Sequence, residues 1–213
     1  MAEGSAPQGG RVPMLYTYHR IELRDAQAAS AQAFSEWIGA ESARKAAEAG
    51  GELLGLFLPQ LGWASHERAL LFRWPKEEKE ALAGSPLITA IRTDRLAATA
   101  RPGDADRPAP GGIFVHRWFV IDPKSRNEFI ELSTGAWTGF ERDFRSGIFG
   151  LFAVEPTPPD GASQRMLLIT RYDSHADWEA SRRPPAESAE RFRRRHQLTR
   201  STIGCSTILA PRG

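Results

Sequence analysis

Apolar side chains recur with two different periods along the chain, and each period predicts a different kind of element. A period of two, or a short run rich in β-branched and aromatic residues, is typical of strands. Such stretches occur at 14–23, 52–58, 68–74, about 95–100, 113–122, 147–154, 165–172 and 201–209. Apolar stripes with helical spacing, helped by capping residues, predict helices at 26–49, 75–83, 124–144, 174–183 and 186–199.

The same order of elements occurs twice: strand, helix, strand, strand, helix, strand. Short motifs repeat with it. The stretch GLFL at 55–58 resembles GLFA at 150–153, and the dipeptide His-Arg occurs at 19–20 and again at 116–117. Matching motifs in a matching element order favour two copies of one unit over chance similarity.

We therefore divide the chain into two repeats joined by a linker. The first repeat covers 14–102, the linker rich in Pro and Gly covers 103–112, and the second repeat covers 113–213. Residues 1–13 are rich in Ala, Gly, Ser and Pro and are predicted to form a disordered tail.

This pattern predicts an α+β fold. Each repeat is expected to be a ferredoxin-like βαββαβ unit, with its helices on one face of an antiparallel sheet. The other face would be bare, so the two sheets are expected to pack against each other and close into an α/β barrel. The stretch IFVHRWFVID at 113–122 is apolar on both faces, as expected for a strand that is covered on both sides.

Composition and charge narrow the class of partner. The chain has 213 residues, with 41% hydrophobic and 25% charged side chains and a net charge of +2, so nothing indicates a nucleic-acid partner. It contains no apolar run long enough to span a membrane. The single Cys205 rules out an internal disulfide and favours a reducing compartment, so we expect a cytoplasmic protein.

Four stretches carry a resemblance to a known family. They are MLYTYHRIEL at 14–23, LGLFLPQLGWASHERALLFRW at 54–74, GLFAVEP at 150–156 and LLITRYDSHADWEASR at 167–182. With them the chain resembles the NIPSNAP family of the dimeric α/β-barrel superfamily, in a tandem arrangement. The first half departs from this pattern at 74–84, where WPKEEKEALAG replaces the Ser-x-x-Asp-Trp helix, and this weakens the case for its second helix.

The resemblance implies the barrel fold and little about activity. The NIPSNAP family has no settled catalytic residues to carry over, while related barrels include monooxygenases without cofactors and haem-dependent enzymes. The sequence assigns no cofactor. Dinucleotide, Walker and nucleophile-elbow motifs are missing from the sequence. His66-Glu67 begins like a zinc-helix motif, but Leu70 takes the place of the second histidine, so no metal site is predicted.

Two groups of residues are candidates for a site. His116 shares a strand face with Phe114 and Trp118, and such an apolar wall with one imidazole predicts a ligand pocket inside the barrel. His19 is its expected counterpart in the first repeat. The simpler alternative for both histidines is a hydrogen-bonded core residue. The neighbouring arginines at 20 and 117 are expected on the opposite face in structural roles.

Arg171 and Tyr172 end a strand near the predicted barrel mouth and could hold an acidic group of a ligand, although rim or cation–π packing is the more common role of such residues. A run of four arginines at 191–195 is expected to be a solvated helix face.

Three functions remain open from the sequence. The first is a protein that binds a small aromatic or apolar molecule in the barrel. The second is a cofactor-independent monooxygenase-type enzyme, or a haem-dependent enzyme that uses His19 or His116. The third is a non-catalytic interaction scaffold. Assembly into a homo-oligomer is a further possibility.

Overall fold

The computed structural model of the protein describes residues 14–24, 28–75, 78–159 and 162–211. The predicted tail at 1–13 lies outside these residues. The strands are β1 (Leu15–Leu23), β2 (Glu52–Leu61), β3 (Glu67–Trp74), β4 (Ile88–Ala98), β5 (Ile113–Ile121), β6 (Ser146–Glu155), β7 (Gln164–Tyr172) and β8 (Thr199–Leu209). The helices are α1 (Ala28–Trp37), α2 (Ala43–Glu48), α3 (Arg126–Asp143), α4 (His175–Ala180) and α5 (Ala186–Gln197).

The eight strands form one closed antiparallel barrel in the order β1-β3-β2-β8-β5-β7-β6-β4. Within each half the strand order is the same, because β2-β3-β1-β4 corresponds to β6-β7-β5-β8. The halves join where β2 pairs with β8 and where β4 pairs with β6. The predicted α+β barrel of two ferredoxin-like sheets is therefore confirmed.

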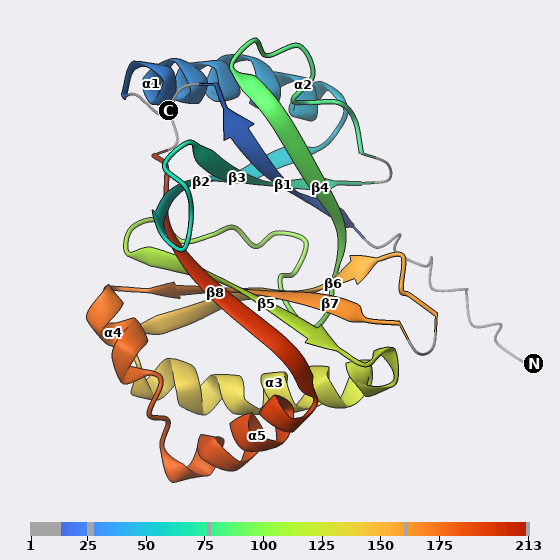
Figure 1. Ribbon diagram of the computed structural model, residues 1–213, viewed down its shortest axis with the longest axis vertical. Helices are drawn as coiled ribbons and strands as arrows, with labels where there is room; N and C mark the ends of the chain where they lie inside the picture. The colour runs from blue at the N-terminus through green and yellow to red at the C-terminus, as the bar shows by residue number, and fades with distance from the viewer. Residues whose placement is uncertain (1–13, 25–27, 76–77, 160–161, 212–213) are drawn as a thin grey trace, which may run out of the picture.

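Three apolar layers hold this arrangement together. One lies between α1, α2 and the sheet of the first half, and contains Phe34, Ile38 and Trp74. The second fills the barrel interior with side chains from both halves. The third lies between the sheet of the second half and helices α3 and α5, with Phe129 and Trp137 at its centre. The two helix layers therefore lie on opposite sides of the barrel (Figure 1).

Most helices begin and end where the sequence predicts them. The first is continuous from α1 through a π-helical segment (Ile38–Ser42) into α2. Ser174 caps α4, because its hydroxyl accepts a hydrogen bond from the Asp177 backbone N–H at 3.2 Å.

The predicted helix at 75–83 is wrong for the described residues of that segment. Positions 78–80 are irregular and 81–87 consist mainly of turns, although Ala81 and Leu82 are buried against the first-half core. A segment this short gains little from helix formation alone, and Gly84, Ser85 and Pro86 end it early. The first half is therefore a βαββ–β unit rather than βαββαβ.

The pairing registers define equivalent positions in the two halves. Leu71 pairs with Tyr18 on one side and Gly55 on the other. Ile169 pairs with His116 on one side and Gly150 on the other. A register shift precedes each glycine, after Leu53 in β2 and after Ile148 in β6. The glycines are thus equivalent, and the counterpart of His116 is Tyr18.

The predicted equivalence of His19 and His116 is consequently wrong by one residue. Side chains alternate between the faces of a strand, so a shift of one position moves a residue to the opposite face. Tyr18 and His116 both point into the barrel, whereas His19 and Arg117 both face a helix layer.

Gly150 tests how tightly this register is packed. A Cβ at Gly150 would lie 2.6 Å from Cδ of Pro102 and 2.9 Å from the ring of Phe152, whereas a Cβ at Gly147 would meet nothing within 4 Å. We expect Gly150→Ala to lower the free energy of unfolding by about 2 kcal/mol, a fall of several degrees in the thermal midpoint. Gly147→Ala, in the same strand, is the control and should change it by less than about 0.5 kcal/mol. Equal midpoints for the two variants would contradict the tight packing.

Candidate functional site

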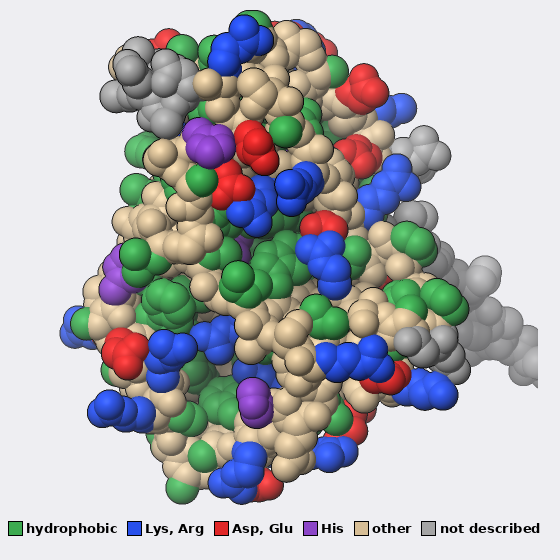
Figure 2. Space-filling view, in the orientation of Figure 1, with side chains coloured by type: hydrophobic (Ala, Val, Ile, Leu, Met, Phe, Trp, Pro, Cys, Tyr) green, Lys and Arg blue, Asp and Glu red, His purple; other side chains and the backbone are tan. Residues whose placement is uncertain are grey.

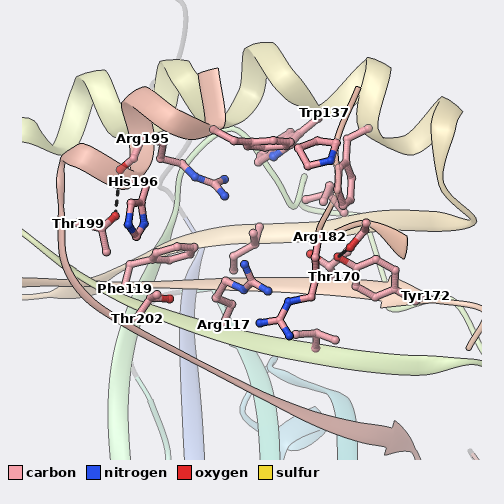
Figure 3. Close-up of a pocket in the computed structure, with 17 residues that line it drawn as sticks. Arg117, Phe119, Trp137, Thr170, Tyr172, Arg182, Arg195, His196, Thr199 and Thr202 are labelled. Atoms are coloured by element: carbon pink, nitrogen blue, oxygen red, sulfur yellow. Dashed lines mark hydrogen bonds between the residues drawn. The ribbon is translucent and has the colours of Figure 1, made fainter. Parts of the chain in front are cut away.

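A pocket of about 210 Å³ lies outside the barrel, between the sheet of the second half and its helices. Its floor comes from β5, β6, β7 and β8, and its walls come from α3, α5 and the segment after α4. Hydrophobic side chains are recessed among lysines and arginines on the surface between α4 and α5 (Figure 2). Figure 3 shows the pocket-lining side chains converging from the strands below and the helices above.

The walls of this pocket are largely aromatic. Trp137 and Phe140 come from α3, Phe192 from α5, Phe119 from β5 and Tyr172 from β7. The ring centre of Phe140 lies 5.7 Å from that of Phe192 and 6.2 Å from that of Tyr172, and both pairs are edge to face. Such a wall favours a flat apolar ligand surface.

Arginines supply the charge of the pocket. Arg117, Arg182 and Arg195 line it, and the lining residues within the described chain include neither Asp nor Glu. Burial lowers the pKa of Arg117, and the nearby Arg182 lowers it further while Tyr172 opposes this. Burial also lowers the pKa of Arg195 to about 10, with a further contribution from Arg117. Both remain cationic at neutral pH.

Arg195 is held in place by aromatic rings. Its guanidinium carbon lies 4.9 Å from the ring centre of Phe192, 5.2 Å from that of Phe119 and 5.7 Å from that of Phe129. It also donates a long hydrogen bond of 3.4 Å to the Ser133 hydroxyl. Cation–π contacts of this kind orient the group and leave its N–H donors available to a ligand.

Two further polar groups belong to residues that line the pocket. The indole Nε1 of Trp137 is buried and has no hydrogen-bond partner among the described residues. The Tyr172 hydroxyl accepts a hydrogen bond from the Ser181 hydroxyl at 3.4 Å. Burial raises the pKa of Tyr172, with Ser181, Arg117 and Arg195 opposing the rise. The tyrosine is therefore a neutral donor at pH 7.

The residues predicted to form a pocket inside the barrel lie in a packed core. His116 is fully buried, and hydrogen bonds join its Nδ1 to the Tyr18 hydroxyl at 2.8 Å and its Nε2 to the Thr207 hydroxyl at 3.0 Å. The rings of Phe57 and Trp63 contact it at 4.6 and 6.1 Å. Burial lowers the pKa of His116 to about 3. This geometry matches the core-histidine alternative.

Phe114 and Trp118 share that face of β5. Phe114 is fully buried against Phe57, and Trp118 lies against Tyr18 with the Arg165 guanidinium 4.5 Å from its ring centre. Both side chains therefore pack within the apolar cluster of the barrel interior.

His19 lies on the helix side of the first half. Its ring nitrogens form hydrogen bonds of 2.9 Å with the Thr93 and Thr17 hydroxyls, and Glu78 lies 3.6 Å from its Nε2. Burial lowers the pKa of His19 to about 4. Both nitrogens of His19 are thus occupied, as are both nitrogens of His116, so neither ring offers a free nitrogen to a haem iron.

Arg171 and Tyr172 lie on opposite faces of β7. Tyr172 lines the helix-side pocket, whereas Arg171 pairs with Asp173 at 2.8 Å and donates to the backbone carbonyls of Pro110 and Gly111. Of the six predicted site residues, Tyr172 alone reaches this pocket. The sequence predicts a structural role for Arg117. Its charge on the helix-facing side of a strand that is covered on both faces was nevertheless a signal of a functional site.

The basic run of α5 is largely paired. Arg193 pairs with Glu190, Arg194 pairs with Glu128 at 2.6 Å, and Arg191 donates to the Gly135 carbonyl. No cluster of His, Cys, Asp or Glu within the described residues is arranged to hold a metal ion. The described helices are each too short or too polar to cross a membrane.

Comparisons with known proteins bear on the fold. No protein-family model matches the chain, and no curated protein sequence matches it significantly. A proposed monooxygenase from Fusobacterium nucleatum has a similar structure, with a TM-score of 0.63, 9% identity and coverage of 94% of both chains. An anthrone oxidase-like protein reaches 0.57 at 12% identity, covering 93% of this chain and 92% of its own.

A single-residue variant of chlorite dismutase from Candidatus Nitrospira defluvii reaches a TM-score of 0.60 at 8% identity, covering 94% of this chain and 92% of its own. At such identities the likeness shows the fold alone. The protein shares its α+β barrel fold with these proteins.

A haem does not fit the residues present. The pocket of about 210 Å³ is smaller than the roughly 300 Å³ at which cavities for drug-sized ligands begin. A haem iron needs an axial ligand such as an imidazole. Among the described lining residues His196 supplies the imidazole, and it is exposed at the end of α5. A macrocycle would require α5 to move off the sheet.

Proposed function

We propose that the protein is a cofactor-independent monooxygenase-type enzyme that binds a small aromatic molecule in the helix-side pocket. The observation that carries this proposal is an aromatic-walled pocket lined by two half-buried arginines, Arg117 and Arg195. The monooxygenase-like proteins with the same fold support the reaction class. In this proposal the ligand lies on the helix side of β5, and the hydrogen bonds and ring contacts that surround His116 support this position over the barrel interior.

The reaction proposed is the oxidation of a phenol to a quinone by dioxygen. The O–H bond and the ring C–H bond opposite it break, one oxygen atom forms the new carbonyl, and the other leaves as water. All four electrons come from the phenol, so no reductant or bound cofactor is required.

The residues of the pocket suit the charge that this reaction develops. A phenolate reacts with dioxygen more readily than a phenol, and cationic donors in a water-poor site stabilise it. Arg195 is positioned on the helix side and Arg117 on the strand side of the same space (Figure 3). The neutral hydroxyl of Tyr172 can donate a hydrogen bond to the oxygen that becomes negative.

Oxygen uptake with phenol and 3-methylphenol tests this proposal. We expect dioxygen consumption, a quinone product that carries one oxygen atom from labelled dioxygen, and release of water. Arg195→Gln should lower kcat roughly 100-fold, since removal of one donor to a developing anion typically costs this much. Arg193→Gln, on the same helix and outside the pocket, is the control and should retain full activity.

Binding of both phenols without oxygen uptake would reduce the protein to a small-molecule binder. Oxygen uptake that survives Arg195→Gln unchanged would exclude the pocket as the reaction site.

We also propose that the chain consists of two related repeats, at 14–102 and 113–213, joined by the linker at 103–112, and that it is related to the NIPSNAP family. The equivalent register shifts before Gly55 and Gly150 support the duplication. Assembly into a homo-oligomer stays a prediction.

A further inference from the structure

We propose that the ligand of the helix-side pocket is a carboxylic acid on a single aromatic ring, and that Arg117 binds its carboxylate. This inference rests on the proposed use of the pocket as a ligand site, and it names the class of molecule that the site selects.

The position of Arg117 is fixed by its strand. It lies at the centre of β5, paired with Leu168 of β7 on one side and Gly204 of β8 on the other. A Cβ at Gly204 would lie 3.7 Å from Nε of Arg117, so the glycine leaves room for the arginine stem against the sheet. The guanidinium therefore enters the pocket from its floor (Figure 3).

The charges around Arg117 leave its own charge uncompensated. The groups that act on it are Tyr172 and Arg182, and no described carboxylate is among them. Arg195 belongs to the same pocket and is likewise cationic. Arg182 has a partner in Glu179 at 3.6 Å, but both side chains are more than half exposed at the rim. Arg117 is half-buried, and a cation partly removed from water without a counter-charge is costly, so a ligand carboxylate would supply the missing charge.

The shape of the guanidinium favours a carboxylate. Arginine presents a planar fork of donors that matches the two oxygens of a carboxylate, and such bidentate pairs are stronger than neutral hydrogen bonds.

The volume of the pocket limits the ligand to one ring. An apolar cavity of about 150 Å³ binds benzene. The pocket holds about 210 Å³, which leaves space for one carboxylate and one small substituent on a benzene-sized ring.

Calorimetric titration with 3-hydroxybenzoate and 3-hydroxybenzamide tests the inference in the wild-type protein. The two probes have the same ring and nearly the same size, and differ in charge. We expect the acid to bind at least tenfold more tightly than the amide. Equal affinities, or no binding of either probe, would overturn the inference.

Two variants assign the preference to Arg117. Arg117→Gln should weaken the acid at least tenfold and the amide less than threefold, and Arg117→Lys should restore part of the loss. Arg193→Gln is the control for a general loss of positive charge and should leave both affinities unchanged. If Arg117→Gln weakened the binding of acid and amide equally, Arg117 would shape the pocket and would not bind the carboxylate. If Arg117→Gln does not fold, the wild-type comparison of acid and amide decides.

Failure here can be told apart from failure of the proposed function. Phenol has no carboxylate. Its oxidation, together with equal binding of acid and amide, would support the proposed reaction and contradict the carboxylate site. Tighter binding of the acid without any oxygen uptake would support the carboxylate site and contradict the proposed reaction.

Discussion

Acidifying the protein from pH 7 to pH 4 is expected to remove about 6 kcal/mol of its free energy of unfolding through two histidines alone. Burial lowers the pKa of His116 to about 3 and that of His19 to about 4, against about 6.5 in an unfolded chain. Below pH 6.5 the unfolded state therefore binds two protons that the folded state does not. Stability falls with pH from that point until each folded-state pKa is reached. A loss of this size is comparable to the whole stability of many domains.

Urea unfolding at a series of pH values measures this loss. Between pH 6 and pH 4.5 each histidine should contribute a slope of about 1.4 kcal/mol per pH unit. His116→Gln and His19→Gln should each reduce the slope by roughly that amount, and the double variant should lose both contributions. Glutamine can retain hydrogen bonds to the neighbouring hydroxyls, so the variants remain comparable in fold. Slopes that stay the same in all three variants would show that both rings accept a proton in the folded state.

The strands were predictable because their signal is local. Alternation and β-branched content placed seven of the eight, and they found only the end of β4, which was predicted at about 95–100 and spans Ile88–Ala98. The bare face of each sheet implied closure into a barrel. The prediction of a helix at 75–83 was wrong because Ala81 and Leu82, its buried residues, can reach the core equally well when the segment forms a turn. Local propensity cannot distinguish these two outcomes when tertiary contacts decide them.

The site was harder to predict than the fold, for a geometric reason. The repeat was aligned through its His-Arg dipeptides, and an error of one residue exchanges the two faces of a strand. That alignment predicted that His19 points into the barrel interior. It also predicted a structural role for Arg117 on the helix side of the sheet. The pocket also needs Trp137 and Arg195 from two different helices. Their meeting depends on how α3 and α5 pack, which no single segment of sequence encodes.

Truncating Phe57 is expected to destabilise the protein by about 3 to 5 kcal/mol, the usual range for Phe→Ala in a core. Phe57 is fully buried at the centre of the barrel, with its ring centre 5.4 Å from that of Phe114 and 4.6 Å from that of His116. Residues from both halves depend on this ring, so the surrounding strands cannot easily collapse into the space. Phe144→Ala, at a partly buried position of the second half, is the control and should cost less.

The same variant tests whether the barrel interior is packed or is a ligand site. Phe57→Ala should leave an apolar cavity, and cavities of this kind bind benzene. Saturating benzene is therefore expected to raise the thermal midpoint of Phe57→Ala well above any change seen in the wild type, because a ligand that binds only the folded state stabilises it. An equal rise in the wild type that a competing ligand of the helix-side pocket does not reduce would mean that the native interior already accepts a ring. The site would then return to the face of Phe114, His116 and Trp118, and the roles proposed for Arg117 and Arg195 would have to be abandoned.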